Sequence, residues 1–86
     1  MSATEITKDE ADEIDADMEI DVTGEVCPYP QLEAKKAMKK LSSGETFVEV
    51  TDHVDSVENV PEVIGADGDV KYWDDDGTFH LYVTKA

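Results

Sequence analysis

The chain has 86 residues, with 22 acidic side chains against seven basic ones, and its formal net charge at pH 7 is −15. A chain of this length forms one small domain. Its negative charge repels phosphate backbones, which excludes direct nucleic-acid binding by the bulk surface. The acid excess and the scarcity of lysine predict a halophilic protein, because high salt screens the self-repulsion; an acidic protein from an ordinary cell is the alternative.

Residues 1–17 form an acidic segment with one lysine and few apolar residues. Its seven acids are Glu5, Asp9, Glu10, Asp12, Glu13, Asp15 and Asp17. This composition is typical of a disordered tail, so we divide the chain into a tail, 1–17, and a domain, 18–86. The segment has neither a basic start nor an apolar run. We therefore expect no signal peptide and no transmembrane helix, and we predict a cytoplasmic protein without membrane contact.

The domain is predicted to contain four strands and two helices in the order β-α-β-α-β-β. A helical period begins at Pro28 and ends before the small residues at 42–44, and a second, weaker one covers 56–65, where Pro61 interrupts it. The apolar face of the first helix comprises Ala34, Ala37, Met38 and Leu41. Alternating apolar residues predict the strands, which cover 18–23, 45–52, 69–73 and 78–85.

These elements predict a two-layer α/β sandwich, with a four-stranded mixed sheet and two helices on one face. In the second strand we expect Thr46, Val48 and Val50 to share one side. The other face of the sheet would be open and would carry Phe47, Trp73 and Tyr82 beside charged residues that include Glu49. The three aromatic residues predict either a surface for docking a partner or scattered residues that stiffen the strands.

Cys27 is the only cysteine, and it lies between the end of the first strand and the start of the first helix. The free N–H groups and the partial positive charge of a helix N-terminus favour a thiolate at such a position. Gly24 breaks the strand, and Pro28 and Pro30 restrict the backbone, so these three residues are expected to shape the site. A lone cysteine cannot form an internal disulfide. We therefore predict an exposed, nucleophilic thiol at Cys27.

The sequence shows little further machinery around this thiol. His53 follows the second strand and is the one histidine that could approach Cys27, since His80 is expected on the open face. One cysteine and two scattered histidines are too few for a zinc site, and no glycine-rich phosphate loop is present, so we predict neither a metal nor a cofactor. Lys35 and Lys36 on the first helix are candidates for docking an acidic partner, or they simply solvate the helix.

The element C-P-x-P at a strand–helix junction, together with the order of elements around it, resembles the TusA/SirA-like family of small sulfur carriers. The matching residues are Gly24, Cys27, Pro28, Pro30, Ala37, Leu41, Gly44, Glu45, Val50, Asp52, Val60 and Pro61, and they extend across 18–86. The resemblance implies a two-layer α/β sandwich and a Cys27 thiol that accepts sulfane sulfur as a persulfide. The donor would be a cysteine desulfurase or a rhodanese-like protein. A downstream protein would accept the sulfur, toward tRNA thiolation or other sulfur metabolism.

The chain departs from the family pattern near the predicted site. Lys35 and Lys36 stand where many relatives carry a basic residue that is often arginine, and His53 stands where many carry proline. These differences concern the identity of donor and acceptor more than the role of Cys27. We therefore predict a sulfurtransferase-type carrier rather than a self-sufficient enzyme. The alternatives are a regulatory interaction module and a redox thiol protein, in both of which Cys27 carries no sulfur.

Overall fold

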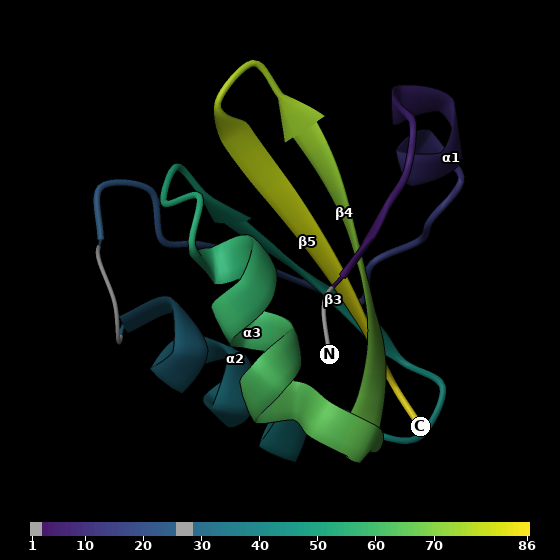
Figure 1. The fold of residues 1–86 in the computed structure, drawn as a ribbon. Helices are drawn as coiled ribbons and strands as arrows, with labels where there is room; N and C mark the ends of the chain where they lie inside the picture. The colour runs from purple at the N-terminus through teal and green to yellow at the C-terminus, as the bar shows by residue number, and fades with distance from the viewer. Residues whose placement is uncertain (1–2, 26–28) are drawn as a thin grey trace.

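The computed structural model describes residues 3–25 and 29–86. Cys27 and Pro28, at the centre of the predicted site, lie outside the described residues. Within these two ranges, five strands and three α-helices are arranged as a sheet with helices packed on it (Figure 1). In chain order they are β1 (Thr4–Glu5), α1 (Lys8–Asp12), β2 (Met18–Asp21), α2 (Tyr29–Lys40), β3 (Thr46–Thr51), α3 (Ser56–Ile64), the short 3₁₀ helix η1 (Gly65–Asp67), β4 (Gly68–Asp75) and β5 (Thr78–Lys85).

The strands form one mixed sheet in the order β1-β4-β5-β3-β2. β2 runs parallel to β3 and β1 runs parallel to β4, whereas β5 is antiparallel to both of its neighbours. The mixed α/β fold was predicted, but the expected count of four strands is wrong, because Thr4 and Glu5 pair with Lys71 and Tyr72 as a fifth strand. A strand of two residues is too short to show the alternation on which the prediction depends.

The main core lies between the sheet and the pair α2 and α3, which cover the same face (Figure 1). Ala34 and Ala37 of α2 are buried against this face, as their helical spacing predicts, and so is Val60 of α3. The sheet contributes Leu81 and Val83 from its central strand β5, both fully buried. Each large apolar side chain buried in this way stabilises the fold by about 1.5–3 kcal/mol.

The prediction for the two faces of β3 is wrong. Phe47 was expected on the open face, but it is fully buried in the main core, opposite Val83 of β5. Glu49 lies on the same face, opposite Leu81, and its side chain is 0% exposed. β3 is an inner strand that is buried on both faces, and Val48 on the other side is also buried. For such a strand the alternation of polar and apolar residues no longer identifies the core side.

The segment predicted as a tail packs on the domain in the structure. The side chain of Thr7 caps α1 and accepts a hydrogen bond from the Glu10 N–H at 3.3 Å, while Glu10 reaches back to the Thr7 N–H. This reciprocal capping box was visible in the sequence as T-K-D-E. Ile6 and Ala11 are buried, and α1 lies across the sheet from α2 and α3 (Figure 1). The outer face of the sheet is therefore partly covered.

Candidate functional site

The candidate site is the edge of the sheet at which the parallel strands β2 and β3 both end. Asp21 is paired with Val50 here, and the next residue, Val22, donates its N–H to the Val50 carbonyl oxygen at 2.8 Å. The chain leaves β2 at this edge and begins α2 at Tyr29. In the sequence, Cys27 belongs to the connection between them, and the structure describes this connection up to Glu25 and again from Tyr29.

Gly24 is held at this edge by a hydrogen bond to Asp52, the residue that follows β3. The Gly24 N–H donates to Asp52 Oδ1 at 3.0 Å, a contact between residues 28 apart in the sequence. The φ of Gly24 is +84°, in the left-handed region that glycine adopts without strain. A Cβ at this position would meet no other atom within 4 Å. The backbone conformation, rather than space, therefore favours glycine here.

A second set of hydrogen bonds fixes the start of the same connection. Asp21 Oδ1 accepts from both the hydroxyl and the N–H of Thr23, at 2.6 and 2.9 Å, and these bonds lower the pKa of the Asp21 carboxyl below its ordinary value. The Glu25 N–H donates to the Val22 carbonyl oxygen at 3.0 Å. The chain is thus well positioned up to Glu25, two residues before the cysteine.

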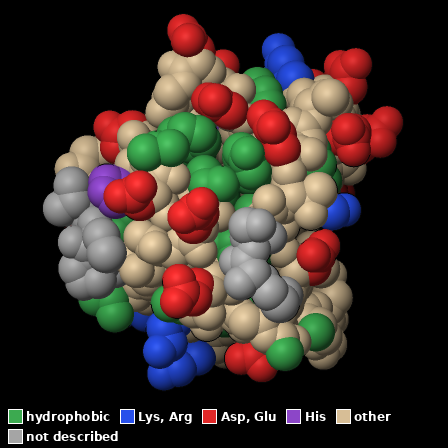
Figure 2. Space-filling view, viewed as in Figure 1, with side chains coloured by type: hydrophobic (Ala, Val, Ile, Leu, Met, Phe, Trp, Pro, Cys, Tyr) green, Lys and Arg blue, Asp and Glu red, His purple; other side chains and the backbone are tan. Residues whose placement is uncertain are grey.

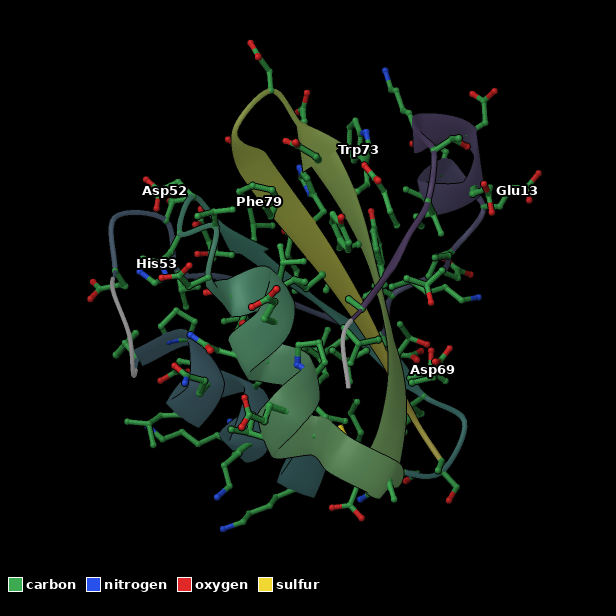
Figure 3. The ribbon with its side chains drawn as sticks, viewed as in Figure 1. Glu13, Asp52, His53, Asp69, Trp73 and Phe79 are labelled. Carbon is green, nitrogen blue, oxygen red and sulfur yellow. The ribbon has the colours of Figure 1, made fainter. Side chains whose placement is uncertain are left out.

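His53 lies beside Asp52 at the end of β3, as the sequence predicted (Figure 3). Its N–H donates to the hydroxyl of Thr51 at 3.1 Å. Its ring nitrogen Nδ1 is buried and has no hydrogen-bond partner among residues 3–25 and 29–86. The predicted pairing of His53 with Cys27 falls on a residue outside the described part of the chain and stays a prediction.

Three exposed apolar side chains belong to the segments that follow β2 and β3, and we call them the apolar rim. They are Tyr29 and Leu32 in the first turn of α2, which are 43% and 51% exposed, and Val54 after β3, which is 62% exposed. Pro30, between the first two, is buried. The rim was not predicted from the sequence. The available signal was that Leu32 falls outside the buried stripe of α2, where a polar residue is the norm.

The other residues predicted for docking do not gather at this edge. Lys36 forms an exposed ion pair with Glu33 at 3.4 Å, whereas Lys35 lines a hollow between α2 and α3. Phe47 is buried and cannot contact a partner. Trp73 and Tyr82 lie half-buried on the outer face of the sheet, where Trp73 stacks on His80 with 4.8 Å between the ring centres.

Glu49 is a fully buried acidic side chain, although it was predicted on the open face of the sheet. Both carboxyl oxygens are buried without a hydrogen-bond partner among the described residues. Burial raises the pKa of Glu49 from its ordinary 4.5 to about 8, and the nearby carboxylate of Glu33 acts in the same direction. Glu49 is therefore mainly neutral at pH 7.

Within residues 3–25 and 29–86, no three His, Cys, Asp or Glu side chains are grouped so as to hold a metal ion. No described helix is both long and apolar enough to span a bilayer.

The chain matches the model of one protein family and several proteins that are named as sulfur carriers. The model of a family described as sulfurtransferase TusA matches residues 18–85. A protein of Archaeoglobus fulgidus named "Putative sulfur carrier protein" is 34% identical over 59 residues, which cover 69% of this chain and 67% of that one. "Putative sulfur carrier protein YedF" of Escherichia coli K12 is 40% identical over 45 residues, which cover 52% and 58%. The chain thus spans between half and two thirds of these relatives.

A solved structure shares the fold. The crystal structure of a SirA-like protein from Desulfitobacterium hafniense superposes with a TM-score of 0.70 at 28% sequence identity. The superposition covers 78% of this chain and 95% of that one.

Proposed function

This chain belongs to the TusA sulfurtransferase family, and on that premise we propose that it is a carrier that holds sulfane sulfur as a persulfide on Cys27 and passes it to an acceptor protein. The Cys27 thiolate attacks the outer sulfur of a donor persulfide, a new S–S bond forms, and the donor thiolate leaves. In the second step an acceptor thiolate attacks the outer sulfur of the Cys27 persulfide, and Cys27 leaves as a thiolate. No net oxidation occurs in either step.

The observation that carries this proposal is the position of Cys27 in the sequence relative to the described edge. The Gly24–Asp52 hydrogen bond holds the chain three residues before the cysteine, and α2 begins two residues after it. The only thiol of the chain is thus flanked by fixed backbone on both sides. Pro28 and Pro30 are proposed to restrict the short connection further, so that the sulfur meets a partner with little conformational entropy left to lose.

The apolar rim supports a protein, rather than a small molecule, as the donor and the acceptor. Exposed apolar side chains that surround a reactive position are typical of docking surfaces. The donor is proposed to be a cysteine desulfurase or a rhodanese-like protein. Lys35 and Lys36 follow Leu32 by one helical turn and stay candidates for contacts beside the rim. Trp73 and Tyr82, on the outer face of the sheet, stay candidates for a second contact area.

Mass spectrometry of the intact protein tests the carrier function. Incubation with a cysteine desulfurase and cysteine should add one sulfur, about 32 Da, to the wild type and nothing to Cys27→Ala. A wild type without the added sulfur, or an equal addition to Cys27→Ala, would refute the proposal. Leu32→Ser should slow loading, whereas Lys71→Ser, on the opposite face, should not.

The wild type and variants of Cys27 also test the two alternatives, a redox thiol protein and an interaction module. A redox thiol would yield a mixed disulfide or an oxygen adduct on Cys27 in place of the added sulfur. An interaction module that uses Trp73 and Tyr82 would keep its cellular function in Cys27→Ser, which a sulfur carrier would lose. The final product, such as a thiolated tRNA, depends on the acceptor.

A further inference from the structure

A hollow of about 340 Å³ lies between the later part of α2, the end of α3 and the last residues of the chain. Its apolar wall comprises Met38, Val63 and Ile64, of which Met38 and Ile64 are buried. This volume is at the lower end of the range of about 300–1,000 Å³ that small-molecule sites occupy. The first turn of α2 carries the rim residues Tyr29 and Leu32, whereas the hollow is lined by Lys35, Met38 and Lys39 from later in the helix.

Three of the seven lysines of this acidic chain line the hollow. Lys35 and Lys39 are exposed, one helical turn apart, and neither forms an ion pair with a described carboxylate. Lys85 Nζ donates to the carbonyl oxygens of Met38 and Leu41, at 3.0 and 2.9 Å. These acceptors are neutral, so the charge of Lys85 is not cancelled by them.

One acidic side chain at the hollow opposes the lysines, that of Asp67 in η1. Ala86 also lines the hollow, and its backbone oxygen accepts a hydrogen bond from the Ser43 hydroxyl at 2.7 Å. The lining still carries more positive than negative charge, whereas the chain as a whole carries −15. Figure 2 shows acidic groups scattered over the visible face and a group of lysine atoms at its lower edge, where Figure 1 draws α2.

We propose that this hollow binds a small amphipathic anion, with its apolar body against Met38, Val63 and Ile64 and its carboxylate between Lys35 and Lys39. Burial of the apolar body supplies most of the affinity. The two unpaired ammonium groups orient the acid, and they select it against a neutral molecule of the same shape. The site is independent of Cys27 and of sulfur transfer.

Octanoate is a suitable probe, with octanol as its neutral counterpart. In an NMR titration of the folded protein, octanoate should shift the amide signals of Met38, Ile64 and Ala66 to saturation, and octanol should bind more weakly. The double variant Lys35→Gln/Lys39→Gln should lose about three- to tenfold in affinity, as expected for two exposed charge contacts. The matched control, Lys36→Gln/Lys40→Gln, changes two exposed lysines of the same helix that do not line the hollow, and it should lose less than about twofold.

Three results would overturn the proposal. The first is a change in the amide signals at the hollow that grows linearly with octanoate concentration and does not saturate. The second is an equal loss of affinity in both double variants, which would show that octanoate senses only the general charge of α2. A filling variant, Ala66→Leu, keeps all the lysines and should weaken octanoate binding if the molecule enters the hollow. Unchanged affinity in Ala66→Leu would place the probe elsewhere and would also refute the site.

Discussion

Replacing Glu49 with glutamine should make the folded protein more stable at neutral pH and remove part of its pH dependence. Glu49 is 0% exposed, and neither of its carboxyl oxygens has a hydrogen-bond partner among the described residues. Its folded-state pKa of about 8 lies above the ordinary value of 4.5 that applies when the chain is unfolded. The folded state therefore keeps a proton that the unfolded state has already released.

Because the pKa of Glu49 is higher in the folded than in the unfolded state, Glu49 makes the free energy of unfolding fall as the pH rises. Below about pH 4.5 both states are protonated and Glu49 causes no loss of stability. Between about pH 4.5 and 8 the free energy of unfolding falls by about 1.4 kcal/mol per pH unit, because only the unfolded state releases the proton. At pH 7 the loss is about 3 kcal/mol, and above pH 8 it levels off at about 5 kcal/mol.

Urea unfolding followed by the fluorescence of Trp73, the only tryptophan, measures this effect at several pH values from about 5 to 9. The difference in unfolding free energy between Glu49→Gln and the wild type isolates Glu49, because the other acidic groups are common to both proteins. We expect this difference to grow with pH and to reach about 3 kcal/mol in favour of Glu49→Gln at pH 7. Parallel pH profiles for the two proteins would refute the reasoning, since they would mean that Glu49 titrates normally and is not buried.

Three further predictions concern packing, the candidate site and salt. A Cβ at Gly68 would lie 2.7 Å from the backbone oxygen of Thr84, so Gly68→Ala should lower the free energy of unfolding by about 1–3 kcal/mol; an unchanged urea midpoint would contradict this packing. Asp52→Ala removes the acceptor of the Gly24 N–H and should cost about 0.5–1.5 kcal/mol of stability and slow sulfur loading of Cys27; normal stability and loading would show that this bond does not position the site. With a net charge of −15, the melting temperature should rise with KCl concentration; a flat profile would remove the halophilic interpretation.

The elements that the sequence predicted well are those with one buried face. α2 has the helical spacing of Ala34, Ala37 and Met38, and all three are buried, because a helix on one side of a sheet can bury only one stripe. The strands β4 and β5 likewise follow their alternation, with Val70 and Leu81 toward the helices. In each case the residues on the far side are less buried than those toward the core, and this difference makes the pattern readable.

The parts that could not be predicted depend on long-range contacts. The outward assignment of Phe47 and Glu49 failed because β3 is covered on both sides, which depends on the position of the strand in the sheet. At the candidate site, the cysteine motif and the position of His53 directly after a strand were visible in the sequence. The bond between Gly24 and Asp52 was not, because it joins residues from the ends of two strands. Local periodicity carries no information about such pairs.

The order of the sheet also has a consequence for self-association. β2 is an edge strand, and one side of its backbone is unpaired in the described structure. Its outward residues Glu19 and Asp21 are exposed acids, so a second copy that tried to extend the sheet there would bring four carboxylates together. The repulsion between these carboxylates is weakened when salt screens it. Conditions that stabilise the fold therefore weaken its protection against strand addition.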